Sequence, residues 1–339
     1  MHAGRHYSIK EILFWTRRDI IVITILSTLP AVLYDVFNIQ WLNIPWLPIA
    51  LIGTAVAFII GFKNNATYSR TWEARQIWGS IVNGSRTWGI MAKDFVSNNH
   101  AKTPVSVEEL KQIQQWLIYR HIAWITALRF QLRQPRKWEN LSVNYNAEYR
   151  NLYSIPELEN KLEDELAKLL PPEEIKLIIS KQNPAAQLIT LQSEVLGKLN
   201  TAGLLDDLRH VEMQNMLKDF FEQQGKCERI KNFPYPRQFA TLNLYFVRLF
   251  IILVPFGMLK EFEKIGENYI WFTIPFSALV CWVFNTMEKI GEVTENPFEG
   301  TANDVPISAI SRTIEIDLRE MLGETDLPPK IEPVHDILM

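Results

Sequence analysis

The residue types that most often carry out chemistry are scattered along this chain rather than grouped. The six histidines lie far apart, and none has metal-ligand spacing to another histidine or to a cysteine. Phosphate-binding glycine loops, HExxH and CxxC motifs are absent from the sequence, and no Ser-His-Asp order stands out. Adjacent acids occur in polar, helix-like segments and are expected to be solvated: Glu108–Glu109, Glu173–Glu174 and Asp206–Asp207. We therefore expect no enzyme, metal centre or cofactor, and favour a permeation protein or a membrane-held scaffold.

A different kind of chemistry, the passage of an ion across lipid, is suggested by the segment Ile44–Phe62. It carries no charge and is long enough for a bilayer core of ~30 Å, which a helix of ~20 residues spans. Thr54, Phe58 and Phe62 recur every four residues and form a bulky, mainly aromatic face on such a helix. In a ring of identical helices this face could line a pore, and the alternative is that the phenylalanines simply face lipid.

A second stripe on the same segment consists of small residues. Gly53, Ala57 and Gly61 also recur every four residues, beside the bulky face. Small residues allow helices in lipid to approach closely. The pattern predicts that this helix packs tightly against a neighbour, with the small face at the contact and the bulky face toward the axis.

Composition and charge separate the chain into membrane and cytosolic parts. The 339 residues carry a net charge of only -3, which provides no basic field to attract nucleic acid. Apolar blocks near both ends predict four membrane spans, at about Ile20–Phe37, Ile44–Phe62, Gln238–Met258 and Ile270–Met287. The basic residues before the first span place both termini in the cytoplasm of a cell (inner) membrane protein.

The predicted fold class is thus an all-α membrane protein with a large cytosolic helical domain. Residues 1–62 hold an amphipathic surface helix (Tyr7–Trp15) and the first two spans, and residues 63–237 form the cytosolic domain. Residues 238–287 hold spans three and four, and residues 288–339 form a cytosolic tail. The tail contains one amphipathic helix around Ile314 and a proline-rich end that we expect to be mobile.

Within the polar block the helical pattern dominates. The helix signals include proline near the first turn of several segments and a Ser106-to-Glu109 capping pattern. The expected helices are Asn64–Val96, Val105–Phe130, Pro156–Leu170, Pro172–Ser180, Pro184–Leu199 and Gly203–Gln224.

Two motifs resemble the bestrophin family, in particular its bacterial members. The first is FKNNATYSRTWEARQIWG (62–79), where the matching residues are Arg70, Trp72, Glu73, Arg75 and Trp78. The second is ENPFEGTANDVPISAISRTIEIDLREMLGE (295–324), which is similar to the family's tail segment through Pro297, Phe298 and Asp304. The layout of two spans, a helical block, two spans and a tail also agrees.

The resemblance implies a homopentameric ion channel, with lipid and permeant ions as its other partners. Its pore would run along the five-fold axis, with a narrow neck at Thr54, Phe58 and Phe62, the residues of the bulky stripe. It further implies a cytosolic aperture on a helix resembling NPAAQLITLQ (183–192), which we assign to Ile189. Arg70, Glu73 and Arg75 are expected to form interhelical ion pairs that hold the pentamer.

The sequence departs from the family at two places. Thr54 makes the outer end of the neck less apolar than the usual aliphatic residue. Animal bestrophins carry an acidic calcium-binding run where this chain has Glu299 to Asp304, with only two acids and one asparagine. Because tight calcium sites use six to eight oxygens and several carboxylates, we predict no calcium gating of that kind, and expect Asp304 to start the tail helix.

The ion is less determined than the fold. Aromatic edges are electropositive and favour anions such as chloride in the neck, and Asn64 and Asn65 at its inner mouth could hydrate either ion. Acids in the cytosolic vestibule could instead favour sodium or potassium. A membrane-anchored scaffold or sensor with a closed neck is the third interpretation.

Overall fold

The computed structural model describes residues 1–339, apart from the side chain of Asn144. The described chain is helical, with only isolated bridges in place of a sheet. The α-helices are α1 (Ile9–Asp35), α2 (Trp46–Asp94), α3 (Val107–Arg133), α4 (Asn144–Arg150), α5 (Pro156–Glu159), α6 (Leu162–Leu166), α7 (Pro172–Ile179), α8 (Pro184–Ala202), α9 (Asp207–Asn232), α10 (Arg237–Glu263), α11 (Thr273–Val293) and α12 (Ile307–Met321). Short 3-10 turns lie at Gln40–Leu42, Asn98–His100 and Glu267–Phe272.

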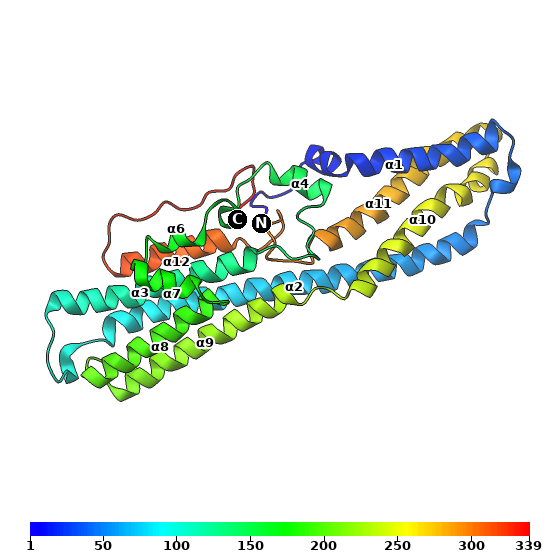
Figure 1. Ribbon diagram of the computed structural model, residues 1–339. Helices are drawn as coiled ribbons and strands as arrows, with labels where there is room; N and C mark the ends of the chain where they lie inside the picture. Colours follow the sequence, from blue (N-terminus) through cyan, green and yellow to red (C-terminus); the bar gives the residue numbers. More distant parts are fainter.

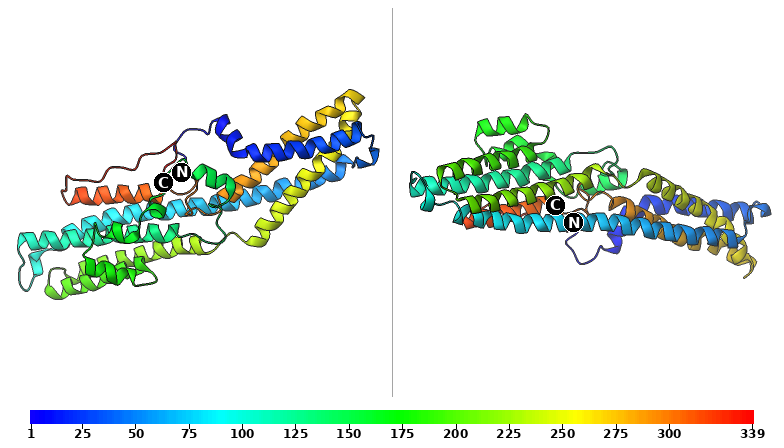
Figure 2. Two further views of the ribbon diagram at one scale, coloured as in Figure 1. Left: turned by 45° about the horizontal axis from the view of Figure 1, so that its top comes forward. Right: turned by 90° about the horizontal axis from the view of Figure 1, so that it is seen from below.

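The molecule is elongated, and α2 joins its two halves (Figures 1 and 2). This helix has 49 residues, which at 1.5 Å per residue makes it about 74 Å long. Its only proline, Pro48, falls in the first turn, where a missing N–H breaks no intrahelical bond. The predicted continuation of Ile44–Phe62 into the polar segment Asn64–Val96 is confirmed.

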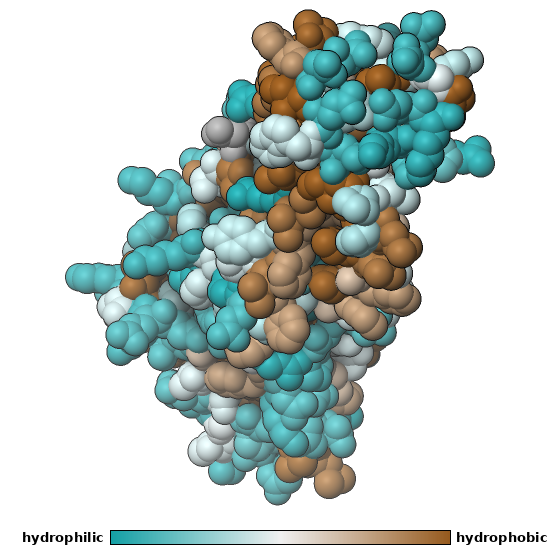
Figure 3. All heavy atoms as spheres, turned by 90° about the vertical axis from the view of Figure 1, so that its right-hand side faces the viewer, coloured by the Kyte–Doolittle hydropathy of each residue, from teal (hydrophilic) through white to brown (hydrophobic). Residues whose placement is uncertain are grey.

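One end of α2 packs with α10 and α11, and α1 packs against these two helices (Figure 1). Their shared core is aliphatic and aromatic, and includes Ile23, Ile49, Val56, Phe250 and Val254. Seen from this end, hydrophobic side chains gather right of the centre of the molecule, with mostly hydrophilic ones below and a mixture of both above (Figure 3). Such a surface suits helices that lie in lipid.

Three segments of the described chain are long and apolar enough to cross a membrane: Gln40–Asp94, Arg237–Glu263 and Glu267–Val293. Helix α1 lies beside α11 but is not among them, because charged residues bracket its apolar run. Arg17, Arg18 and Asp19 precede the run and Asp35 ends it. The predicted surface helix Tyr7–Trp15 is continuous with this span in α1, which starts from a Ser8–Glu11 capping box.

The other half of α2 packs with α3, α9 and α12, and α8 covers α3 and α9 (Figure 1). The centre of this core is aromatic: Trp88, His121, Trp124 and Phe220 lie in mutual ring contact. Because His121 is buried there, its pKa falls to about 3. It is therefore a neutral core residue rather than a proton carrier.

Several helix predictions need correction. The capping box of α3 at Ser106 and Glu109 is confirmed, but Pro156–Leu170 is two short helices, α5 and α6, separated at Asn160 and Lys161. Helix α4 was not predicted. Its seven residues, NYNAEYR, carry no clear apolar period and are placed by tertiary contacts.

The proline-rich end was predicted to be mobile, and this is wrong. Ile337 and Met339 are buried and the last residues meet the N-terminus, where Leu338 N–H donates to the Met1 carbonyl over 2.9 Å. Ala309 at the start of α12 also donates its N–H to the Met339 carbonyl over 2.7 Å. Backbone pairing of this kind leaves no signal in side-chain periodicity.

Candidate functional site

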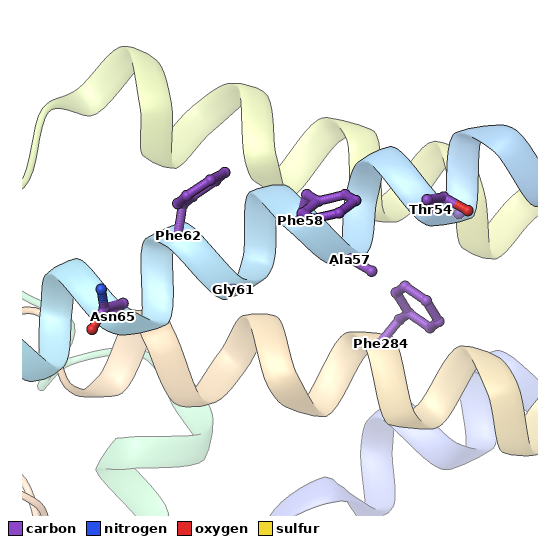
Figure 4. A pocket seen from close by; sticks show the side chains of 8 residues that line it. Thr54, Ala57, Phe58, Gly61, Phe62, Asn65 and Phe284 are labelled. Carbon is purple, nitrogen blue, oxygen red and sulfur yellow. The ribbon is translucent and has the colours of Figure 1, made fainter.

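A groove of about 720 Å³ follows the membrane part of α2 (Figure 4). Phe58 and Phe62 lie on one side of it and Phe284 of α11 lies on the other. Its lining is Gly53, Thr54, Ala57, Phe58, Gly61, Phe62, Asn65 and Phe284. Phe58 is 65% exposed and Phe62 73% exposed within a single chain. The structure therefore leaves the bulky stripe unpartnered by its own subunit.

The small stripe has two parts with different roles. A Cβ atom on Gly53 would lie 2.7 Å from the ring of Phe250, so this glycine lets α10 of the same chain approach. A Cβ atom on Gly61 would meet nothing within 4 Å, and Ala57 is exposed. The predicted close packing is thus present at Gly53, but against α10 of the same chain rather than against a second copy, and only Ala57 and Gly61 stay open.

The two asparagines of the predicted inner mouth point to different sides of α2. Asn65 lies in the groove beside Phe62 (Figure 4). Asn64 instead turns toward α11 and donates its amide N–H to the Met287 carbonyl over 3.1 Å. This corrects the prediction for Asn64, because consecutive helical residues point about 100° apart.

A buried ion pair that the sequence reasoning missed lies next to the groove. Lys63 of α2 bonds Glu288 of α11, and both side chains are almost completely buried. Removing one partner of such a pair leaves an uncompensated buried charge, which lowers the free energy of unfolding by about 3–5 kcal/mol. The sequence feature that could have predicted this pair is a lysine at the end of one apolar span and a glutamate at the end of another.

Arg70 of the first motif binds backbone rather than a carboxylate. Its guanidinium donates to the carbonyls of Ile230 (3.1 Å) and Phe233 (2.9 Å) at the end of α9, and to that of Glu295 (3.0 Å) after α11. The last carbonyls of a helix are unpaired and electronegative, which suits a cation. The prediction of an ion pair for Arg70 is wrong, and the residue ties α2, α9 and the tail within one chain.

The other residues of this motif divide between surface and core. Glu73 forms an ion pair with Arg229 of α9, so its predicted interhelical pair exists, but within the subunit. Arg75 is exposed and forms no ion pair with the described residues. Trp72 is also exposed, whereas Trp78 is fully buried in the cytosolic core.

Ile189 cannot line an aperture, which corrects that prediction. It is buried in the cytosolic core, and α8 turns its side toward α3 and α9. The exposed positions of α8 are the next residue, Thr190, then Glu194 and Lys198, and finally Thr201 and Ala202 at its end. A shift of one residue rotates a helical position by about 100°, so it is enough to exchange a core residue for a surface residue.

The second motif is buried around a charged cluster. Pro297 and Phe298 are buried. Asp304 accepts hydrogen bonds from Gly300 N–H (2.6 Å) and from Arg133 (3.3 Å). Helix α12 begins after Pro306 without a side-chain cap, so the prediction that Asp304 starts the helix is wrong. Asp304 instead closes the turn before it.

Glu299 lies beside this turn and accepts the Asn140 N–H over 2.8 Å. Burial, together with the nearby charge of Asp304, raises the pKa of Glu299 well above its usual range. Burial also raises the pKa of Asp304, against the opposing effect of Arg133. Among the described residues, no group of three or more His, Cys, Asp or Glu side chains is arranged to hold a metal ion.

A family model described as bacterial/fungal bestrophin protein matches residues 10–320, from the start of α1 to the end of α12. The chain belongs to this bestrophin family. Both motifs fall inside the matched range. In this bestrophin the motif residues are structural: Arg70 ties α2 to α9 and to the tail, and Trp78 and Phe298 are packed in the cytosolic core.

Similar proteins with curated names are described as channels. This bestrophin is 28% identical over 287 residues to the voltage-dependent anion channel-forming protein YneE of Escherichia coli K12, covering 84% of this chain and 80% of that protein. It is 29% identical over 294 residues to the voltage-dependent anion channel-forming protein RSc3414 of Ralstonia nicotianae, covering 86% and 83%.

Solved structures agree with the fold. A crystal structure of a bacterial bestrophin homologue from Klebsiella pneumoniae superimposes with a TM-score of 0.73 at 25% identity, covering 90% of this chain and 98% of that one. Another structure of that homologue, carrying the mutation L177T, gives 0.74 at 24% identity. The apolar helices and these matches identify a membrane protein of bestrophin fold.

Proposed function

We propose that this bestrophin is a homopentameric anion channel, with a neck formed by five copies of Thr54, Phe58 and Phe62. The observation that carries the proposal is the exposure of both phenylalanines on a helix that continues directly into the cytosolic half. The names of the relatives, voltage-dependent anion channel-forming proteins, support the same conclusion.

The residues that follow the neck favour a pore over a lipid-facing stripe. On the side of α2 that carries Phe62, the next exposed residues are Asn65, Ser69 and Gln76. A lipid-facing stripe has no need to continue into amides and hydroxyls. A pore does, because it opens from a narrow apolar passage into a water-filled vestibule.

The open part of the groove supports self-association. Ala57 and Gly61 leave space beside Phe58 that no group of the same chain fills. In a ring, the neighbouring subunit fills this space, and its contact with the small residues holds the five α2 helices close to the axis. The proposal also puts residues 63–237 and 288–339, with both termini, in the cytoplasm, because basic residues such as Arg17 and Arg18 precede the first span.

The same proposal makes α1 the fourth span in the inner membrane. Its exposed side chains between the charged ends are large and apolar, as in Ile21, Ile25 and Leu29. The exposed edges of the phenylalanine rings favour partly dehydrated anions such as chloride.

Planar bilayers test this function directly. The purified protein in a KCl gradient should give a current that reverses near the chloride equilibrium potential. Phe58→Ala and Phe62→Ala should widen the neck and increase the conductance, whereas the control Phe276→Ala, an exposed phenylalanine of α11 outside the groove, should not.

Two other outcomes would select a different function. A reversal near the potassium potential would show a cation channel on the same fold. No current from the wild type or from either neck variant would refute conduction and support the membrane-anchored scaffold.

A further inference from the structure

The charged residues of α2 below the neck are nearly all placed away from the pore side. Lys63 is buried against Glu288, Arg70 binds backbone carbonyls, and Arg86 bonds Asp317 on α12. Arg75 and Arg86 follow Phe62 by 13 and 24 residues, which turns them about 120–140° from it. The side of the helix that carries Phe62 is therefore almost free of charge.

Two charges remain on this side. Asp94 ends α2, about 40° from Phe62 in rotation and about 48 Å further along the axis. Glu73 is much nearer: it follows Phe62 by 11 residues, about three helical turns, so it lies within about 20° of the same side and about 16 Å further along the axis. The residues between them on this side, such as Asn65 and Ser69, are uncharged. Glu73 is thus the first charge that an ion meets along α2 on leaving the neck.

Arg229 of α9 neutralises this carboxylate. The two side chains form an ion pair in which Arg229 is 63% and Glu73 43% exposed. Ion pairs that are this exposed to solvent contribute little to folding stability. Arg70, three residues from Glu73 on α2, already holds the end of α9 through the Ile230 and Phe233 carbonyls. The pair is therefore not needed for the attachment of α9.

We propose that Glu73 and Arg229 form a balanced ring of charges that sets the ion preference of the vestibule below the neck. The inference rests on the proposed pore. In a pentamer, loss of Glu73 would leave five arginines around the vestibule, and loss of Arg229 would leave five carboxylates. Rings of one sign concentrate ions of the opposite sign.

Other exposed charges near this ring are already paired or are turned aside. On the same side of α9, Lys218 and Glu222 lie 4.0 Å apart, 11 and 7 residues before Arg229. Arg75 lies on a different side of α2, as its spacing shows. Lys226, three residues before Arg229, is only partly exposed and is turned about 60° from it. The net charge facing the vestibule at this level therefore depends mainly on the Glu73–Arg229 pair.

Opposite substitutions test the ring. Reversal potentials are measured in a KCl gradient for Glu73→Gln and Arg229→Gln. We expect the chloride-to-potassium permeability ratio to rise about threefold for Glu73→Gln and to fall about threefold for Arg229→Gln. The double variant should return to the wild-type ratio. In 1 M salt, where the screening length is about 3 Å, both shifts should nearly disappear.

The pair Arg86–Asp317 supplies matched controls, because it is also a surface ion pair of α2 but lies on another side. Arg86→Gln and Asp317→Asn should leave the permeability ratio unchanged. Should either single variant of the ring fail to assemble, the exchanged pair Glu73→Arg with Arg229→Glu restores neutrality and should conduct with the wild-type ratio.

Unchanged ratios in both single variants, or shifts of the same sign, would overturn the inference while the wild-type current upholds the channel. Absence of wild-type current would instead contradict the proposed function.

Discussion

Two tryptophans of the first motif should respond very differently to the same substitution. Trp78 is completely buried in the cytosolic core, whereas Trp72, six residues earlier on α2, is 54% exposed. Truncating a buried tryptophan to alanine removes the favourable free energy of burying its side chain and leaves a cavity. Together these effects destabilise a protein by about 3–5 kcal/mol. The indole N–H of Trp78 has no hydrogen-bond partner, so no hydrogen bond is lost and the packing estimate applies unchanged.

We therefore expect Trp78→Ala to lower the free energy of unfolding by about 4 kcal/mol. Since each kcal/mol shifts Tm by roughly 2 °C or more in domains of 150–250 residues, the fall in Tm should be about 8 °C. Trp72→Ala should change stability by less than about 1 kcal/mol, because most of its surface already lies outside the fold.

The assay is thermal unfolding in detergent, followed by circular dichroism so that the loss of a tryptophan does not alter the signal. Light scattering before the scan reports the oligomeric state, since exposed Trp72 is free to contact a neighbouring subunit. Equal destabilisation by the two substitutions, with the oligomer intact in both, would refute the assignment of Trp78 to the core.

Two further predictions concern the buried residues Ile189 and Glu299. Ile189→Ala should destabilise the protein by about 2–4 kcal/mol in the thermal assay and leave the single-channel conductance unchanged. The control Thr190→Ala, at an exposed position, should cause no comparable loss of stability. A change in conductance with intact stability would show that Ile189 does line the aperture. Glu299→Gln should alter the pH dependence of stability. Burial raises the pKa of Glu299, so the folded protein keeps a proton that the unfolded chain releases above about pH 4.5. The stability of the wild type therefore falls as the pH rises. The variant lacks this loss, so chemical denaturation at a series of pH values above about 4.5 should show its advantage over the wild type growing as the pH rises. The exposed Glu222→Gln should track the wild type.

The sequence by itself was sufficient for the features that depend on local pattern. The uncharged segment Ile44–Phe62 and the polar helix after it are one helix, α2, because the only proline inside it stands in the first turn. The α3 capping box followed from the Ser106-to-Glu109 spacing. The four-residue spacing placed Thr54, Phe58 and Phe62 on one exposed side of that helix.

Only the tertiary structure decided which partner each side chain meets. Spacing could not show that Gly53 accommodates Phe250 while Gly61 stays open, or that Lys63 meets Glu288 from a helix more than 200 residues away in the chain. Arg70 looked like a partner for a carboxylate and binds three carbonyls instead. These contacts join residues from distant helices, and a periodicity within one helix carries no information about the rotation of another around its own axis.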